Sequence, residues 1–220
     1  MILLFLFACN IIGIEDNWNN GNVTQIKDFF TSTFLITPSD GSLILIDSGY
    51  NKEGKPILNH LETLGKSKED ISMIFLTHGH TDHVRGTNVF PHAEVYALAE
   101  EQEELDESNI TIDVPITHGQ VISIGDSTLE VFSVPGHSSG NAVFLVDDIL
   151  IFGDSAQGLK DGTISTVAEK YSDDPQKAED ELEKLAQTFQ QRATDVSWLA
   201  FSHTGSIEGI QALLDYKSPN

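Results

Sequence analysis

Three histidines and one aspartate lie within a single six-residue segment, His78-Gly-His-Thr-Asp-His83. Only Thr77 separates the segment from an apolar run, Ile71 to Leu76, which predicts a buried strand. Imidazole and carboxylate groups are the nitrogen and oxygen ligands that zinc prefers in proteins. A cluster of this composition at a strand end therefore predicts a metal site, which the rest of the chain must fold around.

The spacing within the cluster suits two ions. In an extended segment His78 and His80 project to the same side, so both can reach one ion. If the chain then turns into a helix, with Thr81 as a candidate N-cap, Asp82 and His83 point in a new direction and can reach a second ion. Ions in a two-metal site lie only ~3.5–4 Å apart, so one short segment can serve both.

The segment resembles the signature His-x-His-x-Asp-His of the metallo-β-lactamase superfamily. Four more segments resemble the other motifs of that family in the same order: Ile46-Asp-Ser-Gly49, Pro135-Gly-His137, Phe152-Gly-Asp154 and Phe201-Ser-His203. The likeness extends over residues 30–215. One departure lies in the last segment, which reads Ser-His203-Thr where the family more usually has Gly-His-Gly.

The resemblance implies a centre with two zinc ions per chain, although manganese and iron also accept such ligands. Carried over by position, the implied ligands are His78, His80 and His137 for one ion, Asp82, His83 and His203 for the other, and Asp154 between the two.

Two aspartates receive further roles by the same resemblance. Asp82 is the expected catalytic residue, placed to orient a water nucleophile and to accept or return its proton, and the alternative is a ligand role only. Asp47 matches a residue that braces the histidine loop from behind, as metal ligands usually require. Its alternative is an aspartate that merely forms a turn.

Residues 26–220 are expected to form one hydrolase domain. Strands come first and then alternate with helices, and apolar strands such as Leu43–Ile46 need cover on both faces. Both this pattern and the resemblance indicate an α/β fold, the αββα four-layer sandwich. The expected helices are 55–64, 174–192 and 207–216, and the expected strands are 33–37, 42–47, 71–76, 93–97, 110–116, 121–124, 128–134, 142–146, 149–152 and 198–201.

Residues 1–25 are expected to lie outside that domain. Their first half is an apolar run, too short for a membrane span of ~20 residues but of the length found in secretory signals. Leu6-Phe-Ala-Cys9 resembles the cleavage box of bacterial lipoprotein signals, so we expect a lipidated Cys9 that attaches the protein to a membrane in the periplasm or cell envelope. The first basic residue is Lys27, which departs from the charged leader of such signals. The alternative is a buried first strand of a cytoplasmic protein.

Residues 15–25 are rich in turn-forming side chains and are expected to be a spacer. Trp18, within this stretch, is a candidate cover for the metal site, with a packing role as the alternative.

The charge balance restricts the partners. Asp and Glu number 34 and Lys and Arg 12, for a formal charge of −22. Binding to a phosphate backbone depends on Lys and Arg that displace counterions, so this chain is not expected to bind nucleic acid. The expected partner is a small-molecule substrate. Arg85, Lys160, Lys170 and Tyr171 are candidate contacts for an anionic group, each with the alternative of a surface residue.

The residue between the ions narrows the expected chemistry. β-Lactamases of this family commonly carry cysteine or serine at this position. The aspartate found here, Asp154, resembles the residue that glyoxalase II and the lactonases carry. The resemblance therefore implies a hydrolase that activates water against a small thioester, ester or lactone. Three alternatives stay open: a β-lactamase, a phosphodiesterase of the same fold, or a metal-binding protein without catalytic activity.

Overall fold

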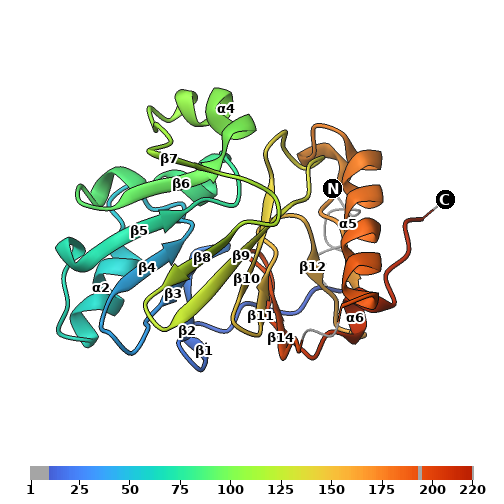
Figure 1. The fold of residues 1–220 in the computed structure, drawn as a ribbon, viewed down its shortest axis with the longest axis horizontal. Helices are drawn as coiled ribbons and strands as arrows, with labels where there is room; N and C mark the ends of the chain where they lie inside the picture. Colours follow the sequence, from blue (N-terminus) through green and yellow to red (C-terminus); the bar gives the residue numbers. More distant parts are fainter. Residues whose placement is uncertain (1–9, 193–194, 220) are drawn as a thin grey trace.

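The computed structural model describes residues 10–192 and 195–219, and two facing β-sheets occupy the middle of the molecule (Figure 1). The first sheet runs in the order of the chain: β1 (Trp18–Asn20), β2 (Val23–Asp28), β3 (Thr31–Ile36), β4 (Leu43–Ile46), β5 (Ile71–Phe75), β6 (Glu94–Leu98) and β7 (Val114–Ile116). The second has the order β15 (Ile207–Glu208), β14 (Trp198–Ala200), β11 (Ile149–Ile151), β10 (Ala142–Val146), β9 (Ser127–Ser133) and β8 (Val121–Ile124). A small hairpin joins β12 (Gln157–Gly158) and β13 (Ile164–Ser165).

Helices cover the outer face of each sheet. On the first sheet lie α2 (Lys55–Thr63), α3 (Thr81–Val84) and α4 (Gln102–Glu107), and on the second lie α5 (Pro175–Gln190) and α6 (Gln211–Leu214). Figure 1 shows α2 and α5 at opposite sides of the sheet pair. Single 3-10 turns are η1 (Lys68–Asp70), η2 (Thr87–Val89), η3 (Ala99–Glu101) and η4 (Glu169–Tyr171).

Three apolar clusters hold the four layers together. One fills the space between the sheets, with Phe34 and Phe75 from the first sheet against Phe144 from the second. The others lie under the helices, where Leu61 of α2 and Leu182 of α5 are fully buried. Each such side chain contributes ~1.5–3 kcal/mol of burial free energy. The expected αββα sandwich is therefore confirmed, and β4 is buried at every position.

The expected spacer is wrong in its second half. β1 lies within residues 15–25 and β2 begins there, and the two strands extend the first sheet at its edge. Trp18 of β1 packs edge-on against Trp198, with ring centroids 5.1 Å apart, and so serves packing rather than cover for the site. Turn-forming residues concealed β1 because an edge strand of three residues needs little apolar sequence.

Three other expectations need correction, and one helix was missed. Residues 110–113 are not strand, so only Val114–Ile116 pairs with β6. His80, not Thr81, holds the N-cap position of α3, and it makes no side-chain capping bond. The closing helix 207–216 divides into β15 and the one-turn helix α6, because Ile207 pairs with Leu199 of β14. Helix α4 was not foreseen.

The structure describes only part of the N-terminal segment for which a lipid anchor is expected. Cys9 lies outside the described residues. Within the described part, Ile12 donates its N–H to the Gly158 carbonyl, and the Lys160 N–H donates to the Asn10 carbonyl. None of the described helices has the length and apolar character that a membrane span requires.

Candidate metal centre

Parallel strand pairs bring the site residues to one edge of the sandwich. β4 and β5 are parallel neighbours with Ile46 opposite Phe75, so the residues that follow both strands leave the sheet side by side. In the second sheet β11 and β14 are also parallel, with Ile151 opposite Ala200. The segments that carry Asp154 and His203 therefore emerge together and face the histidine loop.

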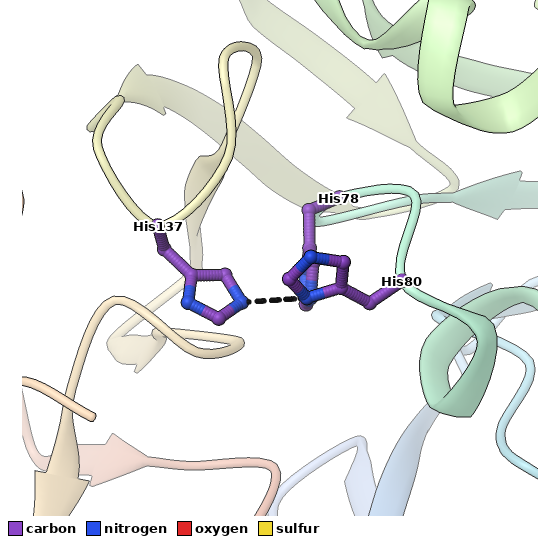
Figure 2. Close-up of side chains that lie close together, drawn as sticks. All are labelled: His78, His80 and His137. Atoms are coloured by element: carbon purple, nitrogen blue, oxygen red, sulfur yellow. Dashed lines mark hydrogen bonds between the residues drawn. The ribbon is translucent and has the colours of Figure 1, made fainter. Parts of the chain in front are cut away.

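Three imidazole rings form what we call the first subsite: His78, His80 and His137. Figure 2 shows their rings converging from the loop after β5 and the loop after β9. His137 Nε2 lies 2.9 Å from His80 Nδ1 and 3.2 Å from His78 Nε2. Two nitrogens bound to one tetrahedral zinc at ~2.0–2.1 Å are roughly 3.3 Å apart, so these separations suit a shared ion.

The second subsite consists of Asp82, His83 and His203. Asp82 Oδ2 lies 3.3 Å from His203 Nε2 and 3.7 Å from His83 Nε2. Asp154 lies between the subsites, with Oδ1 3.2 Å from His83 Nε2 and Oδ2 3.2 Å from His203 Nε2 and 3.6 Å from His137 Nε2. All seven residues predicted as ligands thus lie in one cluster.

Two buried atoms test whether the cluster fits metal ions. His83 Nε2 and Asp154 Oδ1 are both buried without a hydrogen-bond partner, although they lie at ion-pair distance from each other. Leaving such atoms unpaired costs ~1–3 kcal/mol each. A divalent ion bound between imidazole nitrogens and carboxylate oxygens would satisfy both atoms, so the donor set fits zinc.

Each ring of the second subsite is held from behind. Asp47, fully buried, accepts a hydrogen bond of 2.8 Å from His83 Nδ1. The same carboxylate accepts from the N–H and the hydroxyl of Thr77, both at 2.8 Å, which confirms the expected brace of the histidine loop. His203 Nδ1 donates to the Phe30 carbonyl at 2.9 Å. Because the outer nitrogens carry the proton, Nε2 of both rings faces the site.

The first subsite has a different set of outer partners. The Thr77 hydroxyl proton is already given to Asp47, so His78 Nδ1 donates to Thr77 Oγ1, 3.0 Å away. His80 Nε2 lies 3.3 Å from a carboxylate oxygen of Glu104, on α4. His137 Nδ1 lies 3.4 Å from the Ser172 hydroxyl. Glu104 and Ser172 were not foreseen, because neither is near a ligand in sequence and no local pattern marks them.

The electrostatics also differ between the subsites. Burial lowers the pKa of His78 well below its ordinary value and that of His137 to about 4. Burial opposes the charged form of His203 too, but Asp154 outweighs it and raises the pKa to about 10. His83 behaves likewise, its pKa raised well above the usual range by Asp154 and Asp47 against the effect of burial. Although burial disfavours its charge, Asp154 has a pKa well below the usual range because of His203 and His83.

Exposed aromatic side chains border the second subsite. Phe30 stacks on His203 with centroids 5.7 Å apart and planes 9° apart, and Tyr50 lies 5.2 Å from Phe30. Phe29, at the hairpin tip between β2 and β3, is 75% exposed and has φ +62°, a conformation uncommon for a bulky residue. Arg85 lies over the Tyr50 ring at 4.7 Å. We call Phe29, Phe30 and Tyr50 the aromatic rim.

The remaining histidines take no part in the cluster. His60 bonds to the Asn17 side chain and His118 accepts from the Ser133 N–H, while His92 is exposed. Lys170 lies over the ring of Tyr171, 4.4 Å from its centroid, and Tyr171 is exposed.

A pair of facing sheets with overlapping His and Asp groups at one edge defines the class: αββα sandwich proteins with a cluster of metal-binding side chains at the rim. The chain belongs to the metallo-β-lactamase superfamily, whose family model matches residues 26–188. The resemblance to this family is thereby confirmed.

Among individual relatives, the chain is 34% identical over 139 residues to a hydroxyacylglutathione hydrolase of Enterobacter sp. (strain 638). That match covers 61% of this chain and 51% of the relative. The chain thus spans about half the length of the hydroxyacylglutathione hydrolase that it matches, and the homology is distant.

Solved structures share the fold. A metallo-β-lactamase from Pontibacter korlensis superposes with a TM-score of 0.71 at 19% identity, over 92% of this chain and 99% of the other. A subclass B3 metallo-β-lactamase of Bradyrhizobium japonicum gives 0.65 at 20% identity, over 87% and 78%. At these identities the likeness concerns the fold alone.

Proposed function

We propose that this protein is a hydrolase with two metal ions, zinc in the first instance, that cleaves a small thioester, ester or lactone. The observation that carries the proposal is the convergence of seven ligand-type residues into overlapping groups, with His78 and His83 each common to two of them. His78, His80 and His137 would hold one ion, Asp82, His83 and His203 the other, and Asp154 would lie between them.

Bound divalent ions would supply two kinds of chemistry, a lowered pKa for water and polarisation of the substrate carbonyl. The chain itself contributes the proton transfer. Burial raises the pKa of Asp82, but its hydrogen bond to His203 and the charge of His83 outweigh burial and lower the pKa below its ordinary value. The carboxylate is therefore ionised at neutral pH. Asp82 is also partly exposed to the site, which allows Oδ2 to orient a water and accept its proton.

Three observations support a small carbonyl substrate. The relatives at about one-third identity are hydroxyacylglutathione hydrolases. The net charge of −22 disfavours polyanions such as nucleic acid. The aromatic rim borders His203 and offers apolar area to an acyl group.

The test combines metal analysis with a substrate panel. The zinc-loaded protein should contain two zinc ions per chain and hydrolyse a chromogenic thioester or lactone faster than a β-lactam or a phosphodiester. The chelated protein and Asp154→Asn serve as controls and should be inactive. Preferred turnover of the β-lactam or phosphodiester would replace the substrate class, and a zinc-loaded chain inactive on the whole panel would contradict the proposal.

We also propose that Cys9 is lipidated and attaches the protein to a membrane. The proposal rests on the Leu6-Phe-Ala-Cys9 segment. Because Asn10 and Ile12 already bond to the domain, such an anchor would hold the domain close to the lipid surface. Cys9→Ser should move the protein from the membrane to the soluble fraction of cells. A wild-type protein found only in the soluble fraction would contradict the idea.

A further inference from the structure

One buried carboxylate joins the two loops that carry the first subsite. Glu101, the last residue of η3, is fully buried. Its Oε1 accepts the N–H of Gly79 at 2.9 Å, and its Oε2 accepts the N–H of Gly140 at 2.6 Å. Gly79 lies between His78 and His80, and Gly140 lies three residues after His137, so one side chain ties both ligand loops together.

The neighbouring backbone is shaped for this contact. A Cβ on Gly140 would lie 2.6 Å from Glu101 N and 2.7 Å from its Oε2, and one on Gly79 would lie 2.7 Å from Glu104 Cγ. All three separations are shorter than a real Cβ tolerates, so glycine is needed at both positions. A second link runs from the Ser139 hydroxyl to the Glu100 carbonyl at 2.8 Å.

The buried charge needs an explanation. An ionised carboxylate removed from water is destabilising unless hydrogen bonds or opposite charges compensate it. Glu101 meets backbone N–H groups, and no salt bridge of this residue occurs within residues 10–192 and 195–219. A glutamine has one acceptor oxygen where the carboxylate has two, so it would satisfy one loop and point its own NH₂ at the N–H of the other.

We propose that Glu101 is a positioning residue of the first subsite. It sets the separation between the His78–His80 pair and His137 and so determines how tightly that subsite binds its ion. The inference rests on the proposed two-metal function. It assigns no contact with substrate to Glu101, and it predicts an effect confined to one of the two ions.

The test compares Glu101→Gln with Glu103→Gln, which removes the same charge from an exposed position on the adjoining helix α4. Zinc is titrated into each protein in competition with a chromophoric chelator. Glu103→Gln should bind each of the two ions with the same affinity as the wild type does. Glu101→Gln should bind one ion as the wild type does and the other ~10–100-fold more weakly, as for loss of other partners behind metal ligands.

Cobalt identifies which subsite is affected. The absorption spectrum of cobalt-loaded Glu101→Gln should match that of His137→Ala, which lacks a ligand of the first subsite. Equal weakening of both ions, unchanged binding, or a spectrum that matches Asp82→Ala would overturn the inference. A wild type that binds no zinc would instead reject the proposed function and this inference with it.

A measurement on the wild type covers the case in which Glu101→Gln does not fold. The amide protons of Gly79 and Gly140 should exchange with deuterium at least ~100-fold more slowly than unprotected peptide amides, because both are bonded to a buried carboxylate. Exchange of either amide at the unprotected rate would exclude the bridge.

Discussion

The two subsites of the centre are braced in different ways. Behind the second subsite stands Asp47, which leaves the end of β4 and reaches His83 and the backbone of Thr77 directly. Behind the first stand Glu101 of η3, which binds the backbone of both ligand loops, and Glu104 of α4, which faces the His80 ring. The Asp47 brace is part of the strand ends themselves. The Glu101 and Glu104 brace depends on how the short helix α4 packs against the sheet.

The difference shows which parts of such a site are independent of one another. Asp47 and the histidine loop follow parallel neighbouring strands, so their contact is determined by strand pairing. Glu101 is placed by the packing of Leu105 into the cluster under α2 and α4. A change at one brace should therefore weaken the binding of one ion only, whereas a change at Asp154 should weaken the binding of both.

The largest effect is expected at Asp154, the residue common to both halves. Asp154→Asn keeps the shape but removes the negative charge that His83 and His203 face at 3.2 Å. We expect weaker binding of both ions and a fall in kcat/KM of about 10³-fold or more. Asp195→Asn, at an exposed position, is the matched control. Loss of a single ion with activity within tenfold of the wild type would show that Asp154 does not join the subsites.

A smaller and selective effect is expected from Asp47→Asn. The amide has one acceptor oxygen for three donors, from His83 and Thr77, so a buried donor loses its partner. The unfolding free energy should fall by about 1–3 kcal/mol, and the second subsite should lose ~10–100-fold in zinc affinity. Chemical denaturation and zinc competition measure the two quantities.

The comparison with Glu101→Gln sharpens this prediction, because the two variants should weaken opposite ions. If Asp47→Asn and Glu101→Gln produced the same cobalt spectrum, the two braces would not be independent.

The zinc affinities of the two subsites should also depend differently on pH. The pKa of His203 is raised to about 10, and that of His83 is also raised, so below pH 10 zinc must displace protons from the second subsite. Its affinity should rise by about tenfold per pH unit for each proton displaced between pH 6 and 9. His137, with a pKa of about 4, and His78 are already neutral there, so zinc displaces no proton from either ring and the affinity of the first subsite should rise less steeply with pH.

Zinc stoichiometry at fixed free zinc measures this directly. We expect about one ion per chain at pH 6 and two at pH 9. Parallel pH profiles for the two ions would show that the charge difference between the subsites does not control loading.

The smallest effect is expected at the aromatic rim. Phe30→Ala removes the ring that stacks on His203 but keeps the backbone carbonyl that accepts from it. The lost ring contact amounts to about 0.5–1.5 kcal/mol, or a rise in KM of up to about tenfold for substrates with an aromatic acyl group. Steady-state kinetics with aromatic and acetyl substrates test this. Leu64→Ala, at another exposed position, is the control and should leave KM unchanged for both substrates. An equal change for both substrates would argue against acyl binding there.

Much of the architecture could be predicted from local pattern. Helices α2 and α5 and most strands appear where apolar spacing placed them, and Asp174 caps α5 by accepting from the Lys177 N–H. All seven implied ligands lie together, because each follows a strong strand signal and parallel strands end at the same edge. The short elements α4, β1, β2, β12, β13 and β15 escaped prediction, since two to six residues carry too little periodicity.

The sequence alone determined the ligand types, their order along the chain, and the brace at Asp47, because side-chain chemistry and strand ends are local properties. The tertiary structure decided that Glu101 joins two loops, that Glu104 and Ser172 stand behind His80 and His137, and that Phe30 covers His203. These contacts cross long stretches of chain between residues with no shared motif. They exist only once packing has brought a helix, a hairpin tip and a loop to the same edge of the sandwich.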